Sequence, residues 1–322
     1  MEVLAEGEKP FLRPDPDGFR AWVAAHKRRD LVEKLIDEAE AVRRLVADGD
    51  YLVYDCNYLQ RGPNSLLREV IRQRKRNLWV GGKFTWVDAG LLVAGGVVGR
   101  IDVGFIGPWR DQWRRVREHG IPCYEWGNLG MTVRLLAGAM GVPFLPVRFL
   151  GGTDSFYQTG AKVVRDPFTG EAVTLIPALN PDVALIHVHQ ADRYGNARVF
   201  GTGIAHLECA LASKKVILSA EEIIDHEEFR RNPQRTTIPY FLVDAVVHAP
   251  FGGYPGEVQG YYAGDIDHFN ELIGALEGFQ MEDYLEKWVY SVGSDREMLE
   301  VRVGLKKLLA LKSRAQVREG YR

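Results

Sequence analysis

A pair of histidines with a nearby carboxylate is the most conspicuous chemical pattern in the sequence. His187 and His189 are separated by one residue in VALIHVHQAD, so on a strand both side chains point to the same side. Together with Asp192 they could supply part of a zinc site, but no further ligand follows at a useful spacing. We therefore predict hydrogen-bonding histidines and no metal, and we expect His187 and Gln190 to contribute to a binding site.

Glu125 is the residue that we predict to be catalytic. It follows an apolar run, stands between Tyr124 and Trp126, and precedes a glycine. A carboxylate at the carboxyl end of a strand can reach the cleft in which α/β sheets bind ligands. Apolar neighbours would raise its pKa and suit it to acid–base chemistry, whereas a structural carboxylate or surface ion pair is the alternative.

Glycine pairs follow several strand-like or helix-like runs. Backbone N–H groups at such glycines can hold an anion or an oxyanion, although tight turns explain the same pattern. The pairs do not have the spacing of a dinucleotide-binding motif or a P-loop. The residues of this kind that we predict to bind substrate are Gly81, Gly82 and Lys83 after one run, and Gly151, Gly152 and Ser155 after another.

The polar segment from Asp55 to Gly62 follows the first apolar strand. Loops in this position commonly carry binding residues, and we expect Asn57 and Arg61 to do so. Cys56 would need a neighbouring base to act as a nucleophile, and the sequence supplies none nearby. Further along, the pair Glu221-Glu222 follows VILSA, and we expect it to start a helix, where the helix dipole stabilises acids.

Composition excludes several classes of protein. The 322 residues have a net charge of −2, so no global basic field is available to hold nucleic acid or an anionic membrane. The three cysteines are widely spaced, which predicts a reducing, cytoplasmic location. The first residues contain glutamates and no apolar core, unlike a signal peptide. No apolar run approaches the ~18 residues of a membrane span.

The elements that would position these residues alternate along the chain. Apolar strands are expected at 51–54, 78–82, 101–107 and 121–127, with helices of about ten residues between them, and the second half continues in kind. Such a pattern predicts an open, mainly parallel sheet that helices cover on both faces. We divide the chain into an N-terminal arm with helices, 1–48, and one α/β domain, 49–322. Helical spacing is expected at 17–48, 268–292 and 294–316, and within the first range KRRD (27–30) is either a solvated face or a break.

Four longer runs resemble one protein family. They are GVPFLPVRFLGGTD, NPDVALIHVHQADRYGNARVFG, LSAEEIIDHEEFRRNPQRTTIP and VDAVVHAPFGGYPGEVQGYYAGD. Together they resemble the A subunit of family I CoA-transferases, in the glutaconate CoA-transferase branch. The resemblance is good over roughly residues 120 to 290 and follows only the order of elements over 40 to 119.

The resemblance implies a fold, a reaction and a partner. The fold is the open α/β sheet of CoA-transferases, and the assembly is a heterotetramer or heterooctamer of A and B subunits. Coenzyme A is then a substrate, passed from an acyl-CoA to a carboxylic acid, with no permanently bound cofactor. In the family the nucleophilic glutamate lies on the B subunit in a Ser-Glu-Asn-Gly-like motif, which this sequence lacks.

One departure from the family pattern widens the choice of reaction. The A chain usually has a glycine pair and a phenylalanine after its first strand, whereas this chain has Asp55-Cys56-Asn57. A related branch contains hydrolases that open a ring of a steroid-derived acyl-CoA with a glutamate on the A chain, and Glu125 stands at about that place. Two alternatives to the transferase therefore remain, namely a ring-opening hydrolase with Glu125 as its base and a non-catalytic protein that only binds.

Overall fold

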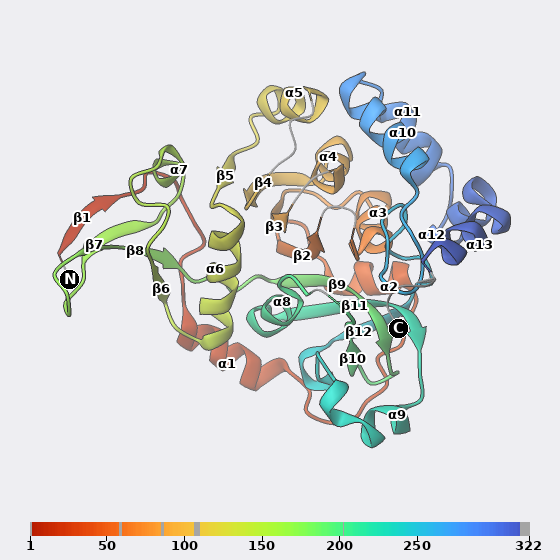
Figure 1. The fold of residues 1–322 in the computed structure, drawn as a ribbon, viewed down its shortest axis with the longest axis horizontal. Helices are drawn as coiled ribbons and strands as arrows, with labels where there is room; N and C mark the ends of the chain where they lie inside the picture. Colours follow the sequence, from red (N-terminus) through yellow and green to blue (C-terminus); the bar gives the residue numbers. More distant parts are fainter. Residues whose placement is uncertain (1, 58–59, 85–86, 106–109, 202, 316–322) are drawn as a thin grey trace, which may run out of the picture.

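The fold is built from two sheets and the helices that cover the larger one (Figure 1). The computed structural model describes residues 2–57, 60–84, 87–105, 110–201 and 203–315. In these ranges, no helix is both long and apolar enough to cross a bilayer.

The larger sheet is parallel apart from one short strand. Its order is β12-β11-β9-β2-β3-β4-β5, and β10 pairs antiparallel with β9. The central strand β9 is buried along nearly its whole length, as expected for a parallel sheet covered on both faces. The predicted mainly parallel α/β sheet is thus confirmed. The strands are β2 (Tyr51–Asn57), β3 (Leu78–Phe84), β4 (Val98–Val103), β5 (Cys123–Glu125), β9 (Val183–Ala191), β10 (Ala197–Arg198), β11 (Lys215–Ile223) and β12 (Ala245–His248).

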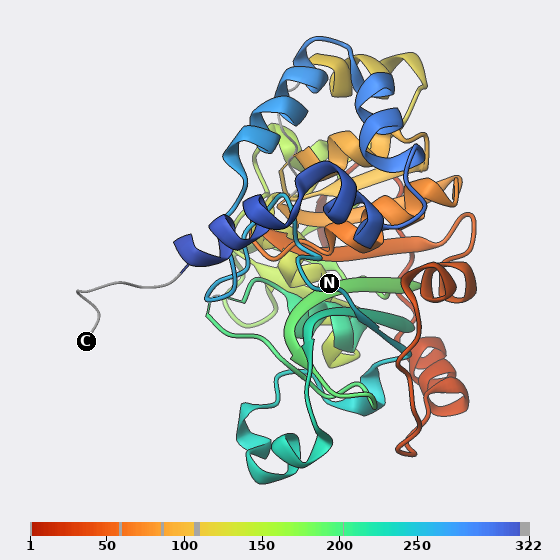
Figure 2. The ribbon, with the colours of Figure 1, turned by 90° about the vertical axis from the view of Figure 1, so that its right-hand side faces the viewer.

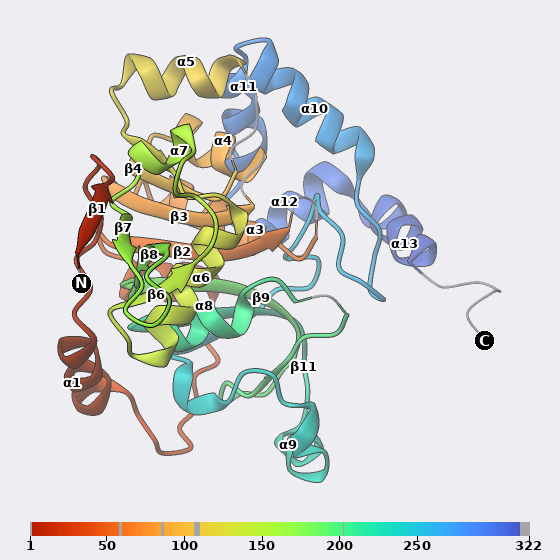
Figure 3. The ribbon, with the colours of Figure 1, turned by 60° about the vertical axis from the view of Figure 1, so that its left-hand side comes forward.

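Helices cover the two faces of this sheet with separate cores (Figures 1 and 3). One core joins the sheet to α2, α3, α4 and the C-terminal helices, and the other joins it to α6 and α8. The short α9 lies beyond β11. The helices of the central region are α3 (Asn64–Arg72), α4 (Val87–Ala94), α5 (Arg110–Glu118), α6 (Asn128–Met140), α7 (Asp154–Tyr157), α8 (His206–Ala212) and α9 (His226–Arg231).

A second, antiparallel sheet was not predicted. Its order is β1-β7-β8-β6, with bounds β1 (Val3–Glu6), β6 (Phe144–Val147), β7 (Lys162–Arg165) and β8 (Ala172–Pro177). Val3 pairs with Val164, so the N-terminal arm contributes an edge strand to a sheet made mostly by the middle of the chain. The division at residue 48 stays a prediction.

Of the two interpretations of KRRD within 17–48, the break is confirmed and the solvated face of a continuous helix is wrong, because the chain leaves the helical conformation between α1 (Pro16–His26) and α2 (Glu38–Leu45). Tertiary contacts explain the break. The Lys27 ammonium group donates to Asp244 at 2.5 Å and to the Leu242 carbonyl at 2.6 Å. The Ile36 N–H donates to the Val246 carbonyl at 3.0 Å, which lays this segment beside β12.

The C-terminal helices are also shorter than expected. The segment consists of α10 (Ile266–Glu277), α11 (Met281–Leu285), α12 (Asp295–Met298) and α13 (Leu305–Arg314), with wider π-type turns at 286–290 and 299–303. Gly304 has a φ of 81°, a left-handed value that favours glycine and separates α13 from the preceding turn. Figure 2 shows these helices stacked along one side of the molecule.

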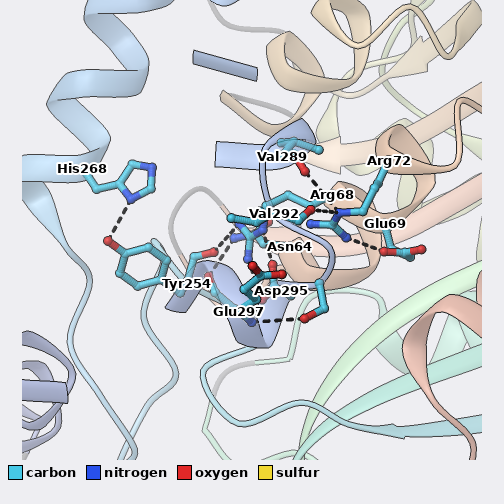
Figure 4. A network of polar contacts seen from close by, with 12 residues as sticks. Asn64, Arg68, Glu69, Arg72, Tyr254, His268, Val289, Val292, Asp295 and Glu297 are labelled. Carbon is cyan, nitrogen blue, oxygen red and sulfur yellow. Dashed lines mark hydrogen bonds and ion pairs between the residues drawn. The ribbon is translucent and has the colours of Figure 1, made fainter. Parts of the chain in front are cut away.

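Two arginines of α3 hold the C-terminal helices against the sheet (Figure 4). The buried Arg68 forms an ion pair with Asp295, and its Nη1 donates to the Tyr254 carbonyl at 2.8 Å. The Arg72 Nε lies within 3.2 Å of the carbonyls of Val289 and Val292. Buried guanidinium groups need such acceptors, so the C-terminal helices and α3 require each other.

A buried ion pair joins β4 to α6 on the opposite face. The Arg134 Nη1 donates to the Asp102 carboxylate at 2.6 Å, and neither side chain is exposed. The Tyr51 hydroxyl donates to the same carboxylate oxygen at 2.7 Å, and the Trp126 ring lies 4.0 Å from the guanidinium. The only charge of α6 therefore points into the protein.

His268 predicts how stability depends on pH. Its ring nitrogens lie 2.8 Å from the Tyr254 hydroxyl and 2.7 Å from the Tyr284 hydroxyl (Figure 4 shows the former). Burial, followed by the nearby Arg68 charge, lowers the pKa of His268 from 6.5 to about 3. The folded state therefore keeps His268 neutral at pH values where the unfolded chain binds a proton.

His268 does not reduce the free energy of unfolding above about pH 6.5, where the ring is neutral in both the folded and the unfolded chain. As the pH falls from there toward the pKa of about 3 in the folded state, the unfolded chain binds a proton and the free energy of unfolding drops by up to ~1.4 kcal/mol per pH unit. Urea unfolding between about pH 7 and pH 4 should show a shallower decline in the His268→Gln variant than in the wild type. His26→Gln, at an exposed histidine of α1, is the control and should follow the wild type. Equal slopes for all three proteins would contradict the assignment.

Candidate active site

The carboxyl ends of β2, β9 and β11 lie side by side, because these strands are parallel neighbours. His187 of β9 is in register with Ser219 of β11. Asp55 and Glu221 are the next acidic residues toward the same ends of β2 and β11. Open α/β sheets bind their ligands at this edge, so these buried polar side chains define the candidate site.

His187 lies between Ser219 and Glu221 in a fully buried chain of hydrogen bonds. Its Nδ1 is 2.8 Å from the Ser219 hydroxyl, and its Nε2 is 2.7 Å from the Glu221 carboxylate. Glu221 also accepts from the Tyr262 hydroxyl at 2.7 Å and from the Phe251 N–H at 2.8 Å. Glu221 therefore fastens the loop between β12 and α10 to the strands, and His187 orients Glu221.

The expectation that Glu221 and Glu222 start a helix is wrong. Both belong to β11, where alternate side chains face opposite sides, so Glu221 is buried and Glu222 is exposed. The signal was present in the sequence: Ser219 and Glu221 are polar at alternating positions of an apolar run, as His187 and His189 are in β9.

Asp55 and Arg61 form a second buried unit beside His187. The Asp55 Oδ2 accepts from the Arg61 Nη2 at 2.5 Å, and its Oδ1 accepts from the Ala205 N–H at 3.0 Å. The Arg61 Nη1 donates to the His187 carbonyl at 2.8 Å. Arg61 thus links β2 to β9 while Asp55 positions the start of α8. The side chain of Asn57 lies outside the described residues.

Burial keeps the Cys56 thiol and the His189 ring in their uncharged forms. Burial raises the pKa of the Cys56 thiol well above its usual range, which keeps it protonated. Burial, and then the charges of Arg61 and His187, lower the pKa of His189 to about 4, and its Nδ1 accepts from the Phe200 N–H at 3.1 Å. In the described ranges, no group of three or more metal-ligating side chains occurs.

Gln190 and Lys83 lie at the rim of this edge. The Gln190 amide donates to the Glu222 carboxylate at 2.9 Å. Burial, and then the neighbouring Glu222 carboxylate, raise the pKa of Tyr261. Lys83 is half-buried near the end of β3, the strand next to β2. The contact of Gln190 and Lys83 with a ligand stays a prediction.

Gly81 and Gly82 lie inside β3 rather than after it. A Cβ atom at Gly81 would stand 2.9 Å from the Tyr51 ring and 3.0 Å from a Val53 methyl, so the position requires close packing between β2 and β3. Gly82 is buried, and its carbonyl accepts from the Gly104 N–H at 3.1 Å. Their binding roles stay predictions.

Glu125 ends the edge strand β5 and is exposed, so the apolar surround that we expected is absent. It lies three strands from β2 in the sheet, a separation of about 14 Å for strands spaced ~4.8 Å apart. It shares the carboxyl edge with Asp55 without contacting the buried units. A ligand as long as an acyl-CoA could touch both places, and the catalytic role stays a prediction.

Gly151, Gly152 and Ser155 lie in the turn and the short helix α7 that follow β6 of the small sheet. The Gly151 N–H donates to the Thr174 hydroxyl of β8 at 3.2 Å, and Gly152 has a φ of 82° in an exposed turn. Ser155 lies half-buried in α7. The structure thus groups these residues with each other and with β8, and their contact with substrate stays a prediction.

Comparison with known proteins gives a consistent family. A family profile described as Coenzyme A transferase matches residues 36–249. The A-type chain of the 3-oxoadipate CoA-transferase from Pseudomonas knackmussii is 31% identical over 72% of this chain and 84% of that protein. The cholesterol ring-cleaving hydrolase IpdA subunit of Rhodococcus jostii is 33% identical over 61% of this chain and 71% of that protein.

A solved structure agrees. The crystal structure of glutaconate coenzyme A-transferase from Acidaminococcus fermentans superposes with a TM-score of 0.80 at 27% identity, covering 87% of this chain and 95% of that chain. The matched family segment includes β2 to β12 and hence the buried units at the carboxyl edge. The chain therefore belongs to the coenzyme A transferase family, as a subunit of the A type.

Proposed function

We propose that this chain is the A subunit of a heteromeric CoA-transferase that moves CoA from an acyl-CoA to a carboxylic acid. The partner B subunit supplies the nucleophilic glutamate, and CoA passes through a thioester on that glutamate. A heterotetramer or heterooctamer in the cytoplasm is the assembly that we propose. The three cysteines, all described and free of disulfides, support the location.

The observation that carries the proposal is that the buried acids at the carboxyl edge are fully engaged in hydrogen bonds within this chain. Asp55 and Glu221 each accept hydrogen bonds from groups on neighbouring segments and are closed off from solvent. They order the walls of a site instead of attacking a thioester. This division suits a chain that shapes the acyl and acid pocket, through Arg61, Lys83 and Gln190, while another chain performs the attack.

A direct test uses the purified A–B complex. Incubation with an acyl-CoA donor should produce a thioester on the B chain that borohydride reduces and hydroxylamine cleaves, and adding an acid should discharge it. This chain alone should be inactive. Turnover without a partner, or a thioester on this chain, would show that the two-chain proposal is wrong.

A ring-opening acyl-CoA hydrolase subunit is the second candidate. Two observations favour it: the buried Asp55–Arg61 pair stands where the family usually has small residues, and Glu125 is exposed at the same edge of the sheet. In this case Glu125 acts as the base. A non-catalytic binding subunit is the remaining alternative.

Glu125→Gln should lower the turnover of the complex about hundredfold, because loss of a general base typically costs 10²–10⁴-fold. Glu118→Gln, at an exposed glutamate of α5, is the matched control and should retain wild-type turnover. The rates of CoA transfer and thioester hydrolysis should be measured in parallel, since the larger loss identifies the reaction that uses Glu125. Unchanged rates for both reactions would remove Glu125 from the site.

A further inference from the structure

The helix α6 buries its charged residue and exposes apolar residues, the opposite of an ordinary surface helix. Its one charged residue, Arg134, is fully buried against Asp102, whereas Leu129, Leu136 and Met140 are 58%, 38% and 58% exposed. These three side chains recur at helical spacing along the outer face of α6. A helix that is apolar on its outer face is normally covered by another protein layer.

The neighbouring helix α8 extends this apolar face. Leu207 and Leu211 are one turn apart, and they are 36% and 37% exposed. The two helices pack against each other, and the Asn180 amide bridges them by donating to the carbonyls of Gly138 and Ala212. We call the exposed residues Leu129, Leu136, Met140, Leu207 and Leu211 the α6–α8 face.

The α6–α8 face begins at the candidate active site. Gly104, just beyond β4, lies directly against Asn128, the first residue of α6. A Cβ atom on Gly104 would stand 2.6 Å from the Asn128 Cα. The start of α8 is fixed by the hydrogen bond from the Ala205 N–H to Asp55. Both helices therefore start at the carboxyl edge and cover the same face of the sheet, with α6 against β3 and β4 and α8 against β2 and β9.

We infer that the α6–α8 face is the docking surface of the B subunit. The inference rests on the proposed function and specifies its partner surface. A protein seated on this face lies next to the carboxyl edge, so it can extend a nucleophile toward that edge, where Glu125 is exposed. A second copy of this chain would lack the Ser-Glu-Asn-Gly-like segment that the reaction needs. The near absence of charge matches the core of a permanent interface.

The test is co-purification of the B chain with tagged variants of this chain. Leu136→Glu/Met140→Glu should weaken binding of the B chain at least about tenfold, because charged side chains are disfavoured in an interface core. Leu305→Glu/Leu309→Glu is the matched control, since these α13 side chains are 70% and 55% exposed. The control should bind the B chain normally, and circular dichroism should show both variants folded.

Cross-linking provides a second measurement that leaves α6 nearly unchanged. A photo-reactive amino acid at position 140 of the otherwise wild-type chain should attach to the B chain in the assembled complex. Attachment to a second copy of this chain, or wild-type binding of the B chain by the α6 variant, would overturn the inference. A complex that assembles through this face but transfers no CoA would overturn only the proposed function.

Discussion

Replacing Glu221 with alanine should lower the free energy of unfolding by about 3–5 kcal/mol, because each buried group left unpaired costs ~1–3 kcal/mol. The carboxylate accepts from the Tyr262 hydroxyl and the Phe251 N–H, and it meets the His187 Nε2 at 2.7 Å. Alanine leaves all three without an acceptor. The loop between β12 and α10 should loosen with it, and activity of the complex should fall.

The adjacent Glu222 is the matched control. It follows Glu221 directly in β11 but is exposed, with the Gln190 amide as its hydrogen-bond donor at 2.9 Å. Glu222→Ala should change the free energy of unfolding by less than about 1 kcal/mol. Urea denaturation measures both variants, and limited proteolysis at the loop reports its order. Equal destabilisation by the two substitutions would contradict the role that we give to Glu221.

The buried pair of Asp102 and Arg134 should give an effect of similar size. Arg134→Met leaves an unpaired carboxylate in the core and should cost about 3–5 kcal/mol. Asp102→Leu leaves an unpaired guanidinium and should cost as much. The double variant Asp102→Leu/Arg134→Met buries no charge and should recover most of the loss, since apolar residues can replace a buried ion pair.

Denaturant unfolding of the four proteins completes a double-mutant cycle. The exposed pair of Arg148 and Glu171, with side chains 83% and 59% accessible, supplies a control. Arg148→Met should change the free energy of unfolding by less than about 1 kcal/mol. A double variant that is as unstable as the sum of its single variants would show that Asp102 and Arg134 do not compensate each other.

The larger sheet could be predicted because its information is local. Most of the parallel strands contain a run of apolar residues, and a helix follows most of them, so pattern and topology agree. The small sheet could not be predicted in the same way. Strand β1 pairs with β7, although β2 to β6 all lie between them in the sequence. In addition, strands of four residues are too short to show a clear alternating pattern.

The candidate site could be predicted in part. His187 and Arg61 stand out by their polarity and position, and the structure brings them together within one buried unit. Glu221 was missed because an acidic pair after an apolar run is also typical of a helix start. Its partners come from strands and loops distant in sequence, and sequence periodicity carries no information about such pairing. Arg134, alone in an apolar helix, is a signal of a buried ion pair that the sequence does carry.

The link between α3 and the C-terminal helices has a consequence during synthesis on the ribosome. Arg68 is made 227 residues before its partner Asp295, so their ion pair cannot form until that later segment has been made. Until residues 289–295 emerge, Arg68 lacks its carboxylate partner and Arg72 lacks the carbonyls of Val289 and Val292, so α3 cannot reach its final packing. The nascent protein therefore completes this layer only when the C-terminal helices have been made, and chains truncated before residue 289 should be substrates for chaperones and proteases.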